Sequence, residues 1–298
     1  MKLFFKIFSV LFLVCFPSLT ISGNSQNIIL TGSQKTGSYI FVKELARIWE
    51  NSVKDRKEDL VPSPETSLVT RLRKLENNRV TGVIIDAETA YLELEKFPGL
   101  QVLSILWSNW LIVLGKVLGS NLNLSVTKTM LVHENSLYFA RAWNSLVPET
   151  NFNWFNSNKL PVLSEGFPED NLIFTAPVPL KEINYLLDQF PGIKLLSLDE
   201  RLVKTLRSKF NWLVPKKFPA NIFLYHSKPI QSVIWHPVMV VRKDFPISKA
   251  TKLLQLIYAQ RNSLIPHPLF HNLKPTDNLP YQKIYAFHPA LKSILKLK

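Results

Sequence analysis

The order of hydrophobic and polar positions predicts strands that alternate with amphipathic helices from Asn27 onward. A short apolar run at Asn27–Ser33 indicates a strand, and apolar residues at helical spacing predict a helix over about Ser38–Ser52. A strand near Asp59–Pro62, a helix at about Ser67–Asn77 and a strand at Val80–Asp86 follow. This βαβαβ order favours a parallel sheet with helices on both faces, and such sheets bind ligands at the carboxyl ends of their strands.

The pattern starts again in the middle of the chain, which indicates a second α/β unit. The elements expected there are a strand leading into a helix near Asn135 or Ser136 within Lys128–Leu146, a strand ending at Thr175, a helix at about Leu180–Phe190, a strand at Lys194–Leu198 and a short helix at Asp199–Phe210. Asn151–Asp170 has little periodicity and is expected to be a loop-rich insertion. Pro215–Pro219 is expected to break the pattern before the chain crosses back.

The carboxyl-terminal third adds one strand and one helix. Val233–Lys243 predicts a strong strand, and Ile247–Leu264 a clear helix. Residues 265–290 are rich in proline and histidine, so we expect extended coil there.

One internal segment, Gln101–Gly119, is almost apolar enough to cross a membrane. Polar residues at Ser104, Ser108 and Asn109 interrupt it, and its β-branched and aromatic content is typical of buried strands. We therefore expect two consecutive core strands and no membrane helix at this position.

The amino terminus has the composition of a secretory signal. Lys2 and Lys6 precede the apolar run Ile7–Phe16, and small or polar residues follow. We expect cleavage near Ser22, so that residues 1–22 are removed, the single cysteine leaves with them and the mature protein is periplasmic. An uncleaved anchor is the alternative, because the run approaches the ~20 residues that span a bilayer.

Composition and charge narrow the function further. Hydrophobic residues make up 46% of the chain and charged residues 19%, which suits a compact globule. Lys2 and Lys6 supply two of the net charges of +14, which leaves +12 on the mature chain. The basic residues are scattered and form no arginine-rich run, so nucleic acid is not expected as a partner. A basic surface near an anionic membrane, or steering of an anionic ligand, accounts for the charge.

The loop Thr31–Tyr39 carries the most informative chemistry. A Walker A loop needs a lysine where Ser38 stands, and the GxGxxG fingerprint is absent because Ser33 and Gln34 follow Gly32. Free amides at a helix amino terminus still attract an anionic or carbonyl-bearing ligand. A capped helix without a ligand is the alternative for this loop.

The sequence contains no complete catalytic or metal-binding motif. Ser125 and Lys128 satisfy SxxK, but the KTG string Lys35–Gly37 precedes them, whereas it follows the nucleophile in penicillin-recognising enzymes. No GxSxG occurs. His267 and His271 have helical spacing, but the prolines around them make a helix improbable, and no HExxH is present. We expect no enzyme activity, no metal and no cofactor.

The layout resembles the TAXI family of periplasmic solute receptors, the binding components of TRAP transporters. The resemblance runs from Asn27 to about Leu291 and is carried by degenerate motifs: ILTGSQKTGSYIFVKELARIW, ETSLV, VTGVIIDAETAY, LQVLSILWSNWLIVLGK, IFTAPVPLKEINYLL and the late Phe287, His288 and Pro289. It implies an α/β, two-lobed, type II periplasmic-binding-protein-like fold, in which each lobe is a mainly parallel sheet flanked by helices. Residues 23–115 plus 225–298 would form the first lobe and 116–224 the second.

The resemblance also implies a ligand cleft between the lobes, which closes without making bonds. The residues expected to line one wall are Thr31, Gly32, Ser33, Gly37, Ser38, Tyr39, Ser67 and Glu88. Those expected on the other wall are Asn135, Ser136, Thr175, Ala176 and Pro177. The implied partners of the monomeric receptor are a small-molecule ligand, anionic or amino-acid-like, and the permease subunits of a TRAP-type transporter. Trp107 and Trp235 are expected to be core or hinge aromatics.

One departure from the family bears on the ligand. Glu134 and Asn135 stand where the family has small residues that let the backbone approach the ligand closely. Loss of ligand affinity, or a different ligand, is therefore a live hypothesis. The alternatives to transport are a degenerate receptor acting as a periplasmic sensor or protein-interaction module, and an exported hydrolase.

Overall fold

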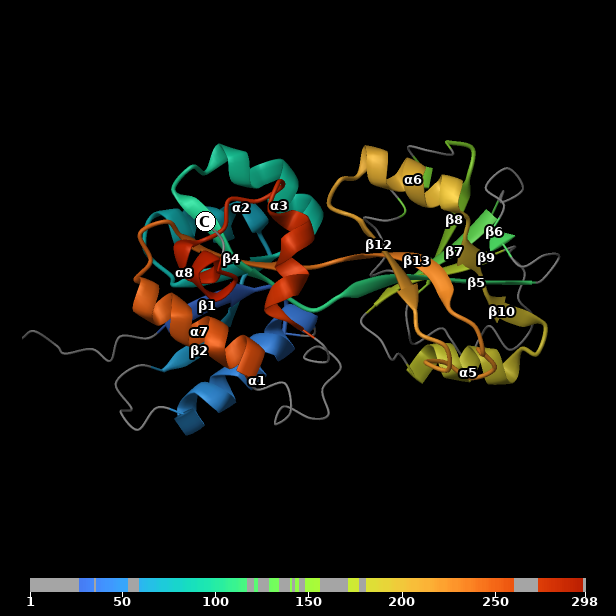
Figure 1. Cartoon of the computed structure of the whole chain (residues 1–298), viewed down its shortest axis with the longest axis horizontal. Helices are drawn as coiled ribbons and strands as arrows, with labels where there is room; N and C mark the ends of the chain where they lie inside the picture. Colours follow the sequence, from blue (N-terminus) through green and yellow to red (C-terminus); the bar gives the residue numbers. More distant parts are fainter. Residues whose placement is uncertain are drawn as a thin grey trace, which may run out of the picture.

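The computed structural model describes residues 27–34, 36–52, 59–116, 121–122, 129–133, 140, 143–144, 148–155, 171–176, 181–259 and 273–296, and these form two lobes side by side (Figure 1). The first lobe has a five-stranded sheet in the order β2-β1-β3-β14-β4. Its elements are β1 Asn27–Thr31, α1 Gly37–Ser52, β2 Leu60–Pro64, α2 Leu68–Glu76, β3 Gly82–Ile85, α3 Ala87–Glu93, η1 Leu94–Lys96, β4 Leu100–Ile105, β14 Val238–Arg242, α7 Ile247–Ala259, η6 Pro275–Tyr281 and α8 Pro289–Ile294.

The second lobe is built on a seven-stranded sheet in the order β12-β13-β5-β9-β7-β8, with β10 also paired to β5, and on the small pair β11-β6. Its elements are β5 Asn109–Lys116, β6 Asn121–Leu122, β7 Thr129–His133, β8 Asn151–Phe155, β9 Asn171–Ala176, α5 Lys181–Gln189, β10 Ile193–Leu195, β11 Ser197–Leu198, α6 Glu200–Lys209, β12 Val214–Phe218 and β13 Ile230–Trp235.

The two large sheets share one plan, which confirms the predicted two-lobed, type II periplasmic-binding-protein-like α/β fold. In the first lobe the parallel strands β2-β1-β3 are followed by the antiparallel β14, which arrives from the second lobe. In the second lobe the parallel strands β8-β7-β9 are followed by the antiparallel β5, which arrives from the first. The chain therefore crosses between lobes twice, and each crossing delivers a central strand.

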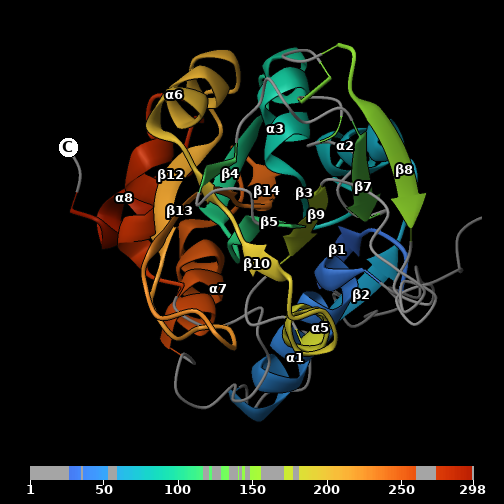
Figure 2. The same ribbon diagram turned by 90° about the vertical axis from the view of Figure 1, so that its right-hand side faces the viewer.

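The amphipathic pattern of α1 is realised as predicted. Phe41, Val42 and Leu45 are fully buried against the first sheet, while Lys43 and Arg47 face solvent. In both views α1 and α7 lie on the opposite side of the first sheet from α2 and α3 (Figures 1 and 2). This follows from right-handed crossovers, because β1 to β2 and β2 to β3 run in opposite directions across the sheet.

The strand β5 divides the core of the second lobe in two. Leu111 and Val113 pack in the cluster that includes α6, whereas Trp110, Ile112 and Leu114 pack in the cluster that includes α5. This alternation is the two-residue period of a strand buried on both faces. Accordingly, α5 and α6 lie on opposite sides of this sheet (Figures 1 and 2).

The apolar segment Gln101–Gly119 forms the two strands β4 and β5 as far as Lys116, as predicted; residues 117–119 lie outside the described part. Among the described residues, no helix combines the length and apolar character needed to cross a bilayer. The expected signal segment, residues 1–22, also lies outside the described residues.

The prediction of mainly parallel sheets is confirmed: among the described strands, β14 alone runs against the others in the first sheet, and β5 and β12 do so in the second. Two other predictions about strands were wrong. Val233–Lys243 is not one strand: β13 ends at Trp235 and β14 begins at Val238, in different sheets. Lys194–Leu198 likewise splits into β10 and β11.

Two segments expected to be irregular contain strands. Asn151–Phe155 forms β8, and Val214–Phe218 forms β12 across Pro215. Both strands lie at sheet edges, where a proline removes no required hydrogen bond. In the expected coil 265–290, η6 and the start of α8 are helical; its residues 265–272 lie outside the described part.

The crossings lie between Ile105 and Asn109 and between Trp235 and Val238. The expected lobe boundaries at 115 and 225 do not coincide with them, since β5 and β13 both belong to the second sheet. The apolar segments Gln101–Gly119 and Val233–Lys243 each continue from one sheet into the other. The hydrophobic pattern therefore does not show where the chain changes sheet.

Candidate functional site

The carboxyl ends of the parallel strands in both sheets point toward the region between the lobes. In the first sheet β1, β2 and β3 end at Thr31, Pro64 and Ile85, at the same edge where β4 leaves for the second lobe. In the second sheet Ala176, the last residue of β9, pairs with Trp110 at the start of β5. The edges at which the parallel strands of the two sheets end therefore face each other, and in open α/β sheets ligands bind at such edges.

The loop between β1 and α1 is closed by a chain of hydrogen bonds. The Gly32 amide donates to Ser38 Oγ at 3.1 Å, and Thr36 Oγ1 donates to the Ser33 carbonyl at 2.6 Å. Ser38 Oγ and Thr36 Oγ1 are 2.9 Å apart. Because the Thr36 hydrogen is already used, Ser38 is the donor in this contact. Both hydroxyls are thus satisfied within the loop.

Thr36 is the centre of this loop, although it was not among the residues expected to line the cleft. A side chain at Gly32 would bring its Cβ to 3.0 Å from Thr36 Oγ1, so glycine at this position allows the close packing of Thr36. Thr31 is fully buried and donates to the Gly32 carbonyl at 3.0 Å, whereas Ser33 is exposed. The amides of Gly37 and Ser38 stand in the first turn of α1, where no intrahelical acceptor exists.

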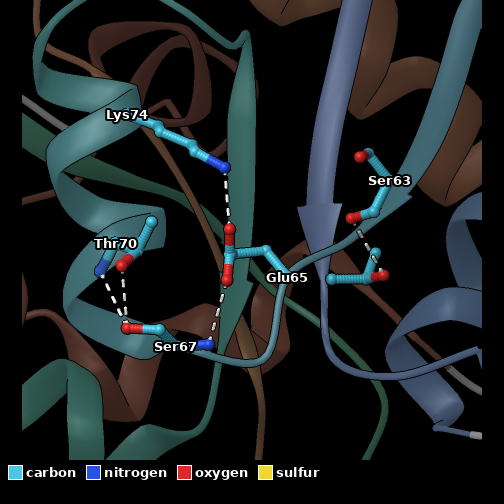
Figure 3. A network of polar contacts seen from close by, with 6 residues as sticks. Ser63, Glu65, Ser67, Thr70 and Lys74 are labelled. Carbon is cyan, nitrogen blue, oxygen red and sulfur yellow. Dashed lines mark hydrogen bonds and ion pairs between the residues drawn. The ribbon is translucent and has the colours of Figure 1, made fainter.

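The second loop at this edge follows β2, and the hydrogen bonds of a helix cap order it (Figure 3). Ser67 is the N-cap of α2 and accepts from the Thr70 amide at 3.3 Å and from Thr70 Oγ1 at 2.8 Å. Glu65 accepts from the Ser67 amide at 3.2 Å and pairs with Lys74 at 2.7 Å. The hydrogen bond from Lys74, together with that from Ser67, holds the pKa of Glu65 below its usual value. The Glu65 amide also donates to the Thr31 carbonyl at 3.0 Å, which joins this loop to the β1–α1 loop.

The third connection at this edge, between β3 and α3, places the Asp86 carboxyl near Arg71. Asp86 is the residue before α3, and burial raises the pKa of its carboxyl, while the charge of Arg71 opposes the rise. Arg71 itself donates to the Ile84 carbonyl at 2.7 Å. Glu88 lies in the first turn of α3 and is partly exposed. Arg71 and Lys74 come from α2, and neither was among the residues expected to line the cleft.

The opposite edge is described only by its strands. Thr175 and Ala176 end β9 opposite Leu111 and Trp110, at the end of the sheet that faces the first lobe. Asn135, Ser136 and Pro177 lie outside the described residues, as does Glu134. The structure therefore gathers the eight expected residues of the first wall at one edge and the two described residues of the second wall at the other.

The two crossing segments are hydrogen-bonded to each other. His236 Nδ1 lies 2.9 Å from the Leu106 carbonyl, to which it donates, and the Leu106 amide donates to the Pro237 carbonyl at 2.7 Å. Burial lowers the pKa of His236 to about 4, and the Leu106 bond only partly opposes this. Trp107 packs on Phe41 at 5.3 Å between ring centres, and Trp235 ends β13. Both tryptophans are buried at the crossings, as predicted.

The described residues hold no group of three or more histidine, cysteine, aspartate or glutamate side chains that could bind a metal ion. Ser125, Lys128, His267 and His271 lie outside the described part, as does Lys35. Two pockets that the described residues form lie in the second lobe and not between the lobes.

No family model matches the chain, and no curated protein matches it. Among solved structures it is similar to XAC2383 from Xanthomonas citri bound to ATP, with 11% identity, a TM-score of 0.48 and coverage of 91% of this chain and 98% of that one. YhfZ from Shigella flexneri shares 11% identity at a TM-score of 0.47, with coverage of 82% and 94%. The cysteine-binding protein from Campylobacter jejuni shares 12% identity at a TM-score of 0.39, with coverage of 89% and 90%. Identities this low transfer neither a ligand nor a partner to this chain.

Proposed function

We propose that this protein is an exported receptor that captures a small ligand between its two lobes and delivers it to a membrane transporter without chemical change. The observation that carries the proposal is the opposition of two sheet edges, each formed by carboxyl ends of parallel strands. Two such edges joined by two crossing segments can close on a ligand by bending at those segments.

The charges of the first edge favour an amino-acid-like ligand over a simple anion. Arg71 and Lys74 are matched there by the carboxyls of Glu65, Asp86 and Glu88. The first-turn amides of α1 suit a carboxylate, and Glu88 suits an ammonium group. A zwitterion meets both requirements, whereas a simple anion meets only the first.

The finer part of the proposal concerns the partner. The resemblance to TAXI receptors assigns delivery to the permease subunits of a TRAP-type transporter, with residues 1–22 removed on export. The mature chain would then act as a periplasmic monomer. A receptor that signals to another exported protein is the second candidate, because Glu134 and Asn135 replace small residues of the family's second-lobe loop.

The test begins with protein purified from the periplasm without denaturation. Intact mass gives the cleavage site, expected near Ser22, and native mass spectrometry identifies any copurified ligand. A panel of L-amino acids and small dicarboxylates is then screened by thermal unfolding. A ligand at one hundred times its Kd should stabilise the fold by ~2.7 kcal/mol.

A matched pair of substitutions locates the site. Ser33 is exposed at the proposed edge, and Lys243 is exposed at the far end of β14. Ser33→Trp should abolish stabilisation by the ligand, and Lys243→Trp should leave it intact. Equal stabilisation of both variants would place the ligand elsewhere and contradict the proposal.

A further inference from the structure

One pocket formed by the described residues lies within the second lobe, outside the region between the lobes. It has a volume of about 750 Å³ and lies between the end of α5, β10 and the loop that leads into β13. Its apolar lining includes Leu187, Ile193, Leu195 and Ile230, which extend the core cluster on this face of the second sheet. The volume is within the range of small-molecule sites, which is about 300 to 1,000 Å³.

The loop beside the pocket is held in a costly conformation. Tyr225 has a left-handed backbone, with φ of 59°, although it is neither glycine nor asparagine. The His226 carbonyl accepts from the Asn221 amide at 2.7 Å, and the Leu224 amide donates to Asn184 Oδ1 of α5 at 3.0 Å. These bonds fix the loop while Tyr225 remains 81% exposed. Strain of this kind persists where the surroundings over-determine it, as at ligand sites.

His226 is the polar group that the pocket leaves unsatisfied. It is only 8% exposed, and among the described residues neither ring nitrogen has a hydrogen bond of normal geometry. Burial lowers the pKa of this imidazole, and a poorly aligned hydrogen bond with the Lys228 backbone opposes only part of the shift. A buried polar side chain without a partner is costly, and such groups call for a specific explanation. A bound ligand that uses these nitrogens supplies one.

The charged residues at the pocket indicate the sign of the ligand. Lys194 and Lys228 line it, and neither has an ion pair among the described residues. The single lining carboxylate, Asp188, already accepts from Tyr225 Oη at 3.4 Å and from Gln189 at 3.2 Å. The pocket thus combines an apolar interior with an uncompensated positive rim.

We propose that this pocket is a second ligand site, which binds an amphiphile with an apolar body and an anionic head, of the medium-chain carboxylate class. The body lies on the apolar residues of α5, β10 and β13. The head accepts a hydrogen bond from His226 and lies near Lys194 and Lys228. The site is separate from the proposed receptor site, and occupation of one does not require the other.

The test uses the mature chain and decanoate below its micelle concentration, with calorimetric titration. Decanoate should bind, and His226→Phe should weaken it about ten-fold or more, because a hydrogen bond to a charged group is lost. The same variant should unfold at an equal or higher temperature without ligand, since an unsatisfied polar group is removed. A merely structural histidine would lower that temperature.

The charge of the head is tested separately. The double variant Lys194→Gln, Lys228→Gln should weaken decanoate but leave decanol unchanged, and the exposed Lys292→Gln serves as the matched control. Ser33→Trp should leave decanoate binding unaltered. Failure of decanoate to bind, or binding unchanged by His226→Phe, overturns the proposal; equal effects on decanoate and decanol overturn the anionic head.

Discussion

The stability of the protein in acid depends on His236, which lies in one of the two crossing segments. Its pKa falls from 6.5 to about 4 on folding, so the folded protein keeps this imidazole neutral. The stabilisation is fully present above pH 6.5 and is lost as pH falls through about 4, by on the order of 3 kcal/mol. His236→Asn keeps a donor toward the Leu106 carbonyl but does not titrate. Chemical denaturation at several pH values should show a flatter profile between pH 6.5 and 4 for this variant; parallel profiles would contradict the assignment.

Asp86 should have the opposite pH dependence. Its pKa is raised by burial, so its contribution to stability is present below the unfolded pKa near 3.8 and is lost as pH rises through the folded value. Asp86→Asn removes the cost of the buried charge, and we expect a higher melting temperature than wild type at pH 7. The advantage should vanish at about pH 4 and below. Glu95→Gln, at an exposed position, should show neither effect.

At the scale of elements, substitutions of Ser67 can distinguish a helix-capping role of this side chain from contact with a ligand. Ser67→Ala removes the acceptor for the Thr70 amide and should cost ~1 kcal/mol in urea denaturation. Ser67→Asp should restore most of that loss, because aspartate caps equally well. If the side chain also contacts a ligand, both variants weaken ligand affinity. If it only caps the helix, affinity is retained in Ser67→Asp.

Element order was predictable because helices and buried strands carry their periodicity locally. The predicted helices at Ser38–Ser52 and Ser67–Asn77 match α1 and α2 to within one residue at each end. Changes of sheet were not predictable, since Val233–Lys243 is apolar on both sides of His236 and Pro237. Edge strands were missed for a related reason: Pro215 in β12 opposes a strand assignment except at an edge, and edges are defined by long-range pairing.

The position of the candidate site was predictable from the sequence, but the contacts between its side chains were not. Loops at strand ends gather at a sheet edge, so the expected residues of the first wall do meet. That Thr36 and Ser38 would satisfy each other, or that Arg71 would lie near Asp86, depends on side-chain packing across elements. Such contacts have no signature in spacing along the chain.

At the scale of the whole molecule, the two lobes should approach each other when the ligand binds. Residues 23–298 contain no cysteine, so in this part of the chain two dyes can be attached through Glu76→Cys on α2 and Arg201→Cys on α6, both exposed and in different lobes. Energy transfer should rise when the ligand identified by mass spectrometry is added, because differential affinity for the closed state shifts the population. The Ser33→Trp variant should show no rise. A distance unchanged by saturating ligand would leave a binding protein without closure and would remove the proposed mechanism of delivery.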